Sequence, residues 1–288
     1  MKARFTALAA GLLCASVLVL ACPPRAVAAE PFKGDWTLSS SGQPGMVQFA
    51  LMHRMHGGNS HHSTDWPVGE FLGVDLDAKG KRDVAFHISR DAGRFDCKGF
   101  LEDSEGAGLF TFTANAQYPK DMRALGFTDI DEEKQFAMAV TDVTVDFARQ
   151  IKRENLSGLD TDKLIAFRIF RVDSQFIHAL RAEGLSAREA GKLIAFRVHG
   201  VTPEYVRAMR GAGLEAGEDR LIAFRVHGVT PEFVDQVRSL GFENLDSGQL
   251  VAMRVHGVTP EYITRLRSRG LKDLTIEKMI GMRVHGID

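Results

Sequence analysis

Residues 196–205 read Phe-Arg-Val-His-Gly-Val-Thr-Pro-Glu-Tyr, and this phrase decides the fold because it returns at a fixed interval. It recurs with small changes at residues 224–233 and 253–262, and it begins once more at Met282. The interval is about 29 residues, which is too short for a domain and suits one helical hairpin. The repeat therefore predicts a solenoid of paired short helices.

Capping residues divide each repeat into helices. Thr202 is suited to cap a helix, because its hydroxyl can accept a hydrogen bond from a first-turn amide, and Pro203 then occupies the first helical position. Glycine after a helix favours a left-handed C-cap. We therefore predict a positive φ at Gly200, Gly228 and Gly257.

A second helix completes each unit. Residues 186–189 read Ser-Ala-Arg-Glu, which predicts a capping box leading into the apolar residues 193–198. Weaker copies extend the period backward, with Asp173 and Thr144 as the expected caps. Because one hairpin cannot bury its own apolar face, neighbouring units must stack, and we expect an α-solenoid over residues 114–288.

The first 28 residues have the pattern of a secretory signal. Lys2 and Arg4 precede an apolar run, and Ala28 ends a small-residue cleavage site. An alternative is lipoprotein processing, since Val-Leu-Ala precedes Cys22, which would then carry the lipid. The sequence thus predicts a secreted or periplasmic protein, or one held in the bacterial envelope by a lipid anchor.

Charge and cysteine content argue against a nucleic-acid-binding function and against an internal disulfide. The formal net charge is −1, and removal of the leader would also remove Lys2, Arg4 and Arg25, leaving a mildly acidic chain. This argues against a nucleic-acid-binding groove. Cleavage after Ala28 would leave Cys97 as the only cysteine, which excludes an internal disulfide.

Residues 31–113 show a different periodicity. Apolar residues alternate with polar ones at residues 47–51, 84–88, 95–99 and 109–112, as in half-buried strands. Residues 91–93 predict a hairpin turn, and residues 106–108 predict another. The expected domain is a small antiparallel sheet, either a sandwich or an open barrel, with Trp36 in its first strand.

The predicted fold class is therefore α+β, with a signal peptide at 1–28, an antiparallel β domain at 31–113 and a helical repeat domain at 114–288. No glycine- or proline-rich linker separates the last strand from the first helix. We expect the sheet to abut the first repeat and to act as the N-terminal cap that a solenoid needs.

A histidine-rich segment raises the possibility of metal binding. Its potential ligands are His53, His56, His61, His62 and Asp65. Imidazole and carboxylate groups bind zinc, nickel or copper. The spacing matches no structural zinc pattern, so the alternative is a polar hairpin loop between strands.

Three columns of residues recur with the period. The histidines lie at predicted helix C-termini, where an imidazole can bond free carbonyls. The two basic columns predict either a ridge for an acidic partner or lipid headgroups, or else a solvated face or ion pairs between repeats with Glu204, Glu232 and Glu261. The columns are His199, His227, His256 and His285; Arg168, Arg197, Arg225, Arg254 and Arg283; and Arg123, Lys152, Arg181, Arg210, Arg238 and Arg267.

The first helix of successive units varies at its outward positions, which is how repeat scaffolds present a binding face. The candidate partner-binding residues are Arg207, Arg210, Asp235, Arg238, Arg265 and Arg267. Their excess of positive charge predicts an acidic or anionic protein partner.

Catalytic motifs are absent from the sequence. It contains no nucleophile elbow, phosphate-binding loop, dinucleotide fingerprint or His-Glu-x-x-His zinc motif. Cys97 lies on the inward face of a predicted strand, which favours a core position over a nucleophile. We therefore expect neither an enzyme nor a cofactor.

The chain resembles an uncharacterised group of bacterial envelope tandem-repeat proteins. The resemblance lies in residues 197–205, in Arg-Asp-Ala-Gly at 90–93 and in Gly-Ala-Gly-Leu-Phe-Thr-Phe at 106–112. The repeats alone resemble the tails of membrane zinc metallopeptidases of the beta-lactam-sensor type. The chain lacks the peptidase motif, so the resemblance does not imply peptidase activity.

Two functions follow from the sequence. The first is a non-catalytic binding or scaffolding protein of the envelope, which presents its repeat surface to another protein. The alternative is a metal-binding or metal-sensing protein that uses the histidine segment.

Overall fold

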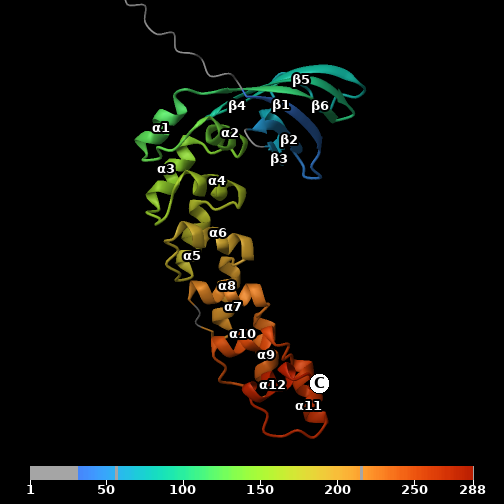
Figure 1. The fold of residues 1–288 in the computed structure, drawn as a ribbon, viewed down its shortest axis with the longest axis vertical. Helices are drawn as coiled ribbons and strands as arrows, with labels where there is room; N and C mark the ends of the chain where they lie inside the picture. The colour runs from blue at the N-terminus through green and yellow to red at the C-terminus, as the bar shows by residue number, and fades with distance from the viewer. Residues whose placement is uncertain (1–31, 56–57, 215–216, 288) are drawn as a thin grey trace, which may run out of the picture. The chain divides into compact units, whose positions relative to one another are not determined.

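A computed structural model describes residues 32–55, 58–214 and 217–287, which lie within one compact unit, Pro31–Asp288. The predictions at Cys22 and Ala28 lie outside these residues. No helix in the described ranges is long and apolar enough to cross a membrane. Figure 1 shows the strands at one end of the described chain and the helices following in chain order.

The strands form a single antiparallel sheet with the order β3-β2-β1-β6-β5-β4. The strands are β1 (Phe32–Ser40), β2 (Met46–Met55), β3 (Gly58–Pro67), β4 (Arg82–Arg90), β5 (Gly93–Glu102) and β6 (Glu105–Ala114), with the short 3-10 helix η1 (Val68–Glu70) after β3. The sandwich alternative is therefore wrong, because all six strands belong to one sheet.

Alternation places one row of side chains from each strand on the concave face. Trp36, Phe49 and Phe110 are among the fully buried residues there. The sheet curves strongly, since Trp66 of β3 lies 5.8 Å, between ring centroids, from Phe95 of β5. This contact across non-neighbouring strands is the geometry of an incomplete barrel.

One predicted turn is confirmed and one is wrong. Asp91 and Ala92 join β4 to β5, as predicted. Residues 106–108 lie inside β6, and the turn before that strand is made by Asp103 and Ser104, both with positive φ. Glycines 106 and 108 are instead needed where strands approach closely: a Cβ on Gly108 would lie 2.1 Å from the Lys98 carbonyl oxygen.

Twelve short helices follow within the described ranges. They are α1 (Tyr118–Ala124), α2 (Glu132–Val140), α3 (Val145–Arg153), α4 (Thr161–Ile169), α5 (Ser174–Ala182), α6 (Ala190–His199), α7 (Pro203–Gly211), α8 (Glu218–His227), α9 (Pro231–Ser239), α10 (Ser247–Val255), α11 (Pro260–Ser268) and α12 (Ile276–Val284). The α+β prediction with a helical repeat region is confirmed.

The predicted caps decide where most of these helices begin and end. Thr202 accepts a hydrogen bond from the Tyr205 amide, and Asp173 and Thr144 act in the same way on α5 and α3. Gly200, Gly228 and Gly257 all adopt positive φ, close to 70°. The left-handed glycine caps are thus confirmed.

The predicted capping box at residues 186–189 is wrong. Helix α6 begins at Ala190, and the Glu189 side chain makes no capping hydrogen bond. Ala187 has φ 45°, while Ser186 Oγ donates instead to Glu218 Oε1 of the next repeat at 2.8 Å. The segment before α6 joins neighbouring repeats, so its polar groups are not available to cap α6.

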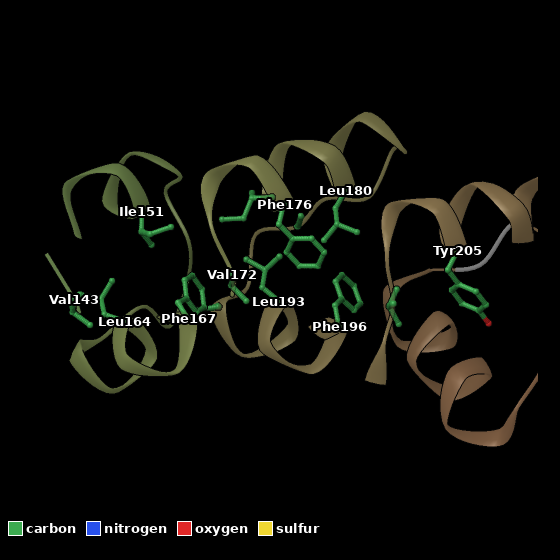
Figure 2. Close-up of a cluster of buried hydrophobic side chains, with 14 of the residues drawn as sticks. Val143, Ile151, Leu164, Phe167, Val172, Phe176, Leu180, Leu193, Phe196 and Tyr205 are labelled. Atoms are coloured by element: carbon green, nitrogen blue, oxygen red, sulfur yellow. The ribbon is translucent and has the colours of Figure 1, made fainter. Parts of the chain in front are cut away.

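The helices form two rows that share a core. The odd row (α3, α5, α7, α9, α11) and the even row (α4, α6, α8, α10, α12) each contain successive helices in contact, such as α5 with α7 and α6 with α8. Figure 2 shows Phe176 and Leu180 of α5 pointing toward Leu193 and Phe196 of α6 between the rows. All four are buried, so each repeat completes the core of its neighbours.

The sheet packs against the first repeat, as predicted. Phe136 of α2 lies within 6.0 Å, between ring centroids, of Phe95, Phe110 and Phe112 on the concave face. Gln135 Nε2 donates to the carbonyl oxygens of Ala92 and Asn115. The sheet and the repeats therefore share one hydrophobic core. The division into two domains at residues 113 and 114 stays a prediction.

Candidate functional site

The first arginine column forms joints between consecutive repeats. Each arginine near the end of an even helix places its guanidinium over the aromatic ring that the preceding odd helix carries in its first turn. The distances from guanidinium carbon to ring centroid are 5.2 Å for Arg168 on Phe147, 3.7 Å for Arg197 on Phe176, 4.7 Å for Arg225 on Tyr205, 5.0 Å for Arg254 on Phe233 and 4.8 Å for Arg283 on Tyr262. Such cation–π contacts stabilise each interface.

Arg225 and Arg254 also cap the preceding even helix, whereas the Arg197 Nε is buried and has no hydrogen-bond partner among the described residues. Arg225 Nε donates to the His199 carbonyl oxygen, and Arg254 Nε donates to that of His227, both at 3.2 Å. These carbonyls are unsatisfied helix ends, so the cap of one helix is supplied by the next repeat. The Arg254 guanidinium lies against the glycine that ends α8, because a Cβ on Gly228 would be 2.8 Å from Arg254 Nη2, and Arg225 and Arg283 lie in the same way against Gly200 and Gly257.

Two sequence interpretations of these columns are corrected. One alternative for the arginines was ion pairs with Glu204, Glu232 and Glu261, but no such ion pair forms between described groups, and each glutamate is instead bonded at the start of its own helix. The histidine side chains were expected to bond helix-end carbonyls. No side-chain hydrogen bond forms among the described residues for His199, His227, His256 or His285, and at the ends of α6 and α8 the carbonyl oxygen accepts from Arg225 and Arg254 instead.

Half of the predicted partner-binding set belongs to a second line of joints, between odd helices. Arg267 Nη2 donates to the Leu240 carbonyl oxygen at 2.7 Å, and Arg238 donates to that of Ala212. The Arg210 guanidinium lies against Gly184, where an added Cβ would be 2.8 Å from Nη1. These three arginines hold consecutive repeats together, which any partner-binding role would have to accommodate.

The other three members of that set are exposed on the odd row. Arg207 forms an ion pair with Glu183 of the preceding repeat, with Nε 3.0 Å from Oε1. Arg265 lies 5.6 Å from the Tyr262 ring centroid, and Asp235 points to solvent. The structure brings none of these three together, since they sit one to a helix on α7, α9 and α11.

The even row carries an exposed apolar surface that the sequence interpretation missed. On α6, Leu193 and Phe196 enter the core, Ile194 is half-buried and packs against that core, and Val198 is exposed. The equivalent aliphatic residue is 57% exposed at Ile169, 53% at Val198, Val226 and Val255, and 61% at Val284. We define the aliphatic ridge as these five exposed residues, Ile169, Val198, Val226, Val255 and Val284, together with the half-buried residues one turn before them that also pack against the core, Ile165, Ile194, Ile222, Val251 and Ile280.

This ridge is unusual because exposed positions of a solvated helix are normally polar. Single exposed valines need no explanation, but a contiguous apolar strip on a soluble fold usually marks an interaction site. Successive even helices are in contact, so the equivalent aliphatic positions recur along one side of the row. The signal was present in the sequence, since residues 193–198 are apolar on every side of a helix except at Arg197.

The histidine segment is part of the sheet rather than a loop. His53 lies on β2 and His61, His62 and Asp65 lie on β3, while His56 falls outside the described residues. Strand alternation points His53 and His62 to the concave face, and it points His61 and Asp65 to the other. Among the described residues no group of three or more histidine, cysteine or acidic side chains could hold a metal ion.

His53 is buried at the joint between the sheet and α2. It is 4% exposed, neither ring nitrogen has a hydrogen-bond partner, and its ring lies 4.4 Å from that of Phe136, between centroids. Burial lowers its pKa from the usual 6.5, against the opposing effect of Glu133. The His62 ring stacks on the His53 ring, with 6.2 Å between the ring centroids. The pKa of His62 is also lowered, mainly by burial and then by the nearby His53 and His61.

Cys97 is a core residue, as the sequence predicted. It is 1% exposed on the concave face of β5, and burial raises the pKa of its thiol. A thiol held in its protonated form is a poor nucleophile.

No family model matches the chain, and no curated protein matches it. The resemblance to envelope repeat proteins therefore stays a prediction.

Proposed function

We propose that this chain is a non-catalytic binding or scaffolding protein, and that it binds its partner through the aliphatic ridge. The observation that supports this most is the retention of an aliphatic residue at the same exposed position of five consecutive even helices. A position that is more than half exposed does not need a branched apolar side chain for folding. Its repetition in every unit is best explained by contact with another protein surface.

The predicted location is consistent with such a role. A signal ending at Ala28, or a lipid anchor at Cys22, would place the repeats in the bacterial envelope, free or held at a membrane. The exposed residues Arg207, Asp235 and Arg265 of the odd row remain candidates for a second, polar contact with an acidic partner. Partner binding would then involve an apolar contact at the ridge and a charged contact on the odd row, and each can be tested separately.

The test is capture from an envelope extract with the full chain as bait. We expect Val226→Glu/Val255→Glu to lose the captured partner, because each change puts a carboxylate into an apolar contact. The matched control is Gln175→Glu/Gln236→Glu, which adds the same charges at exposed positions of the odd row. Equal capture by both variants and the parent would refute the ridge as the binding surface.

A variant without the sheet is unsuitable as bait in this experiment, because the deletion would disturb the fold of the first repeat. Phe136 and Gln135 of α2 would lose the contacts that bury them. Variants with substitutions on exposed residues keep the shared core intact, and circular dichroism with a melting curve verifies this for each bait.

A further inference from the structure

We propose that a groove between α9 and α11 binds an acidic peptide segment of a partner protein, with one carboxylate of that segment at Arg265 and Arg267. This inference rests on the proposed function, in which the odd row makes a second, polar contact with an acidic partner, and it names the place and the chemistry of that contact. Earlier repeats of the same row show which group occupies this place when the chain provides it.

The groove has a volume of about 530 Å³ and lies between two successive odd helices. Gln236, Ser239 and Leu240 of α9 form one side, and the α11 side includes Pro260 and Arg265. Leu240 is half-buried, whereas Gln236, Ser239 and Arg265 are exposed. The groove therefore offers an apolar contact together with polar groups that can orient a ligand.

The C-cap residue of the odd helices changes along the row. It is a glutamate in α3 and α5, Glu154 and Glu183, but it is Ala212 in α7 and Leu240 in α9. Both glutamates form an ion pair with an arginine of the next odd helix. The chain provides no carboxylate at the two later C-caps, and the groove lies at the second of them.

Arg181 and Arg267 occupy the same position of α5 and α11. Arg181 donates to the Glu154 carboxylate at 2.6 Å and to the Glu154 carbonyl oxygen at 3.1 Å. Arg267 donates to the equivalent carbonyl oxygen, that of Leu240, at 2.7 Å, but it has no carboxylate partner among the described residues. A carboxylate from another protein can therefore take the place that the Glu154 side chain has beside Arg181.

Arg265 brings a second cation to the groove. It stands where α5 and α7 have alanine, Ala179 and Ala208. Its guanidinium carbon lies 5.6 Å from the Tyr262 ring centroid, and in the described ranges its side chain has neither an ion pair nor a hydrogen bond. An exposed guanidinium of this kind can donate two parallel hydrogen bonds to one carboxylate.

The remaining polar groups favour a peptide over a lone anion. The hydroxyls of Ser239, Thr264 and Ser268 each donate within their own helix. Their oxygens are left to accept, which suits backbone N–H groups and disfavours further anionic oxygens. Glu261, one turn before Arg265, adds a negative charge at the other end of the groove. An acidic side chain is therefore favoured only at the Arg265 end.

Fluorescence anisotropy with two labelled hexapeptides tests the chemistry of the site. One probe alternates leucine with glutamate, and the other alternates leucine with glutamine. We expect the full chain to bind only the first probe, with an affinity that falls as the salt concentration rises. Binding of both probes alike, or of neither, would overturn the inference.

Two variants test the location. Arg265→Ala restores the residue of α5 and α7, and Leu240→Glu places in the chain the carboxylate that α3 and α5 carry at their C-caps. Each should raise the dissociation constant of the acidic probe more than about tenfold. Gln175→Glu adds a charge at an exposed position of α5 and should bind as the parent does. Melting curves verify the fold, and parent-like binding by Arg265→Ala would overturn the location.

Anionic lipid is the other source of negative charge, and cosedimentation with phosphatidylglycerol vesicles tests it. We expect Arg265→Ala to cosediment to the same extent as the parent, because the groove is suited to a peptide. Cosedimentation by the parent that is lost in Arg265→Ala would place a lipid headgroup at this arginine and overturn the peptide as the ligand.

The groove and the ridge fail separately. A probe that does not bind, with a ridge variant that loses its captured protein, would refute the groove and leave the ridge as a binding surface. A probe that binds, with a ridge variant that captures as the parent does, would refute the ridge and leave the groove. Because Gln236 lines the groove, Gln175→Glu alone is the control for the ridge if the double control variant loses capture.

Discussion

Gly228 meets two requirements at one position. Its φ is 70°, a left-handed conformation that disfavours side chains, and the space beside it is filled by the Arg254 guanidinium. Gly241 meets only the first, with φ 84° and nothing within 4 Å of an added Cβ. Substitutions at Gly228 and Gly241 can therefore distinguish the cost of backbone strain from the cost of crowding against the arginine.

We expect Gly241→Ala to lower the free energy of unfolding by about 1 kcal/mol, from backbone strain alone. Gly228→Ala should cost at least about twice as much, because it also displaces Arg254 from the His227 carbonyl. Thermal unfolding of both variants measures the difference. Equal midpoints would show that the arginine joint contributes little.

His53 predicts a dependence of stability on pH. In the folded protein burial holds its pKa below 6.5, and the groups that face it are His62 of β3 and Glu133 of α2. The unfolded chain therefore binds more protons as the pH falls below about 6.5. Stability is complete above that pH and declines below it, toward the lowered pKa of the folded state.

His53→Phe should flatten this decline, because phenylalanine does not titrate and can pack against Phe32 and Phe136. The measurement is the melting temperature at pH 7.5 and pH 5.5 for both proteins. Ser63→Ala, at an exposed position of β3 that does not titrate, is the control and should keep the slope of the parent. A parent melting temperature that does not change with pH would contradict the role of His53.

Among the elements, β4 is tied to α2 by one side chain. Arg90 forms an ion pair with Glu70 at 2.8 Å and donates to the carbonyl oxygens of Ala139 and Val140 at the end of α2. Its guanidinium carbon also lies 3.5 Å from the Trp66 ring centroid. The side chain is 7% exposed, so all these groups lose a buried partner if it is removed.

Arg90→Gln should lower the free energy of unfolding by about 3 kcal/mol, as expected when one member of a buried ion pair is removed. Arg94→Gln, which breaks the half-exposed pair with Asp96, should cost less than about 1 kcal/mol. Hydrogen exchange of the α2 amides should rise in the first variant only. Comparable losses in both variants would mean that Arg90 does not hold the sheet to α2.

Elements whose signals are local could be predicted from the sequence. Thr202-Pro203 and Gly200 determine helix ends through bonds within a few residues, so they are readable without the fold. The start of α6 could not be predicted in this way, because Ser186 bonds Glu218 in the next repeat. The same limit applies to the candidate site. The arginine columns could be found in the sequence, but the carbonyl groups that Arg238 and Arg267 contact belong to the preceding repeat.

At the scale of the whole molecule, the joints made by Arg225 and Arg254 have the same parts. An arginine stacks on an aromatic ring and caps a helix of the repeat before it, and the next repeat supplies the same groups in turn. Stability should therefore be close to a sum over repeats and nearest-neighbour contacts. Loss of one complete repeat would leave each remaining joint with its partners.

Deletion of residues 201–228 joins Gly200 to Val229 and regenerates Phe-Arg-Val-His-Gly-Val-Thr-Pro-Glu-Phe across the new junction. We expect this variant to fold, with unchanged helical content per residue and a modestly lower melting temperature. Deletion of residues 201–214 removes α7 alone and leaves Phe224 without its covering helix, so it should aggregate. Similar behaviour of both deletions would contradict interchangeable joints.

The interchangeable joint also matters for how such a gene can change. Because Arg-Val-His-Gly-Val-Thr-Pro-Glu stands at the boundaries at residues 197–204, 225–232 and 254–261, unequal recombination between those copies adds or removes whole units without creating a mismatched boundary. The length of the row, and with it the number of valines in the ridge, can therefore be adjusted in steps of one unit while the sheet at the start stays untouched.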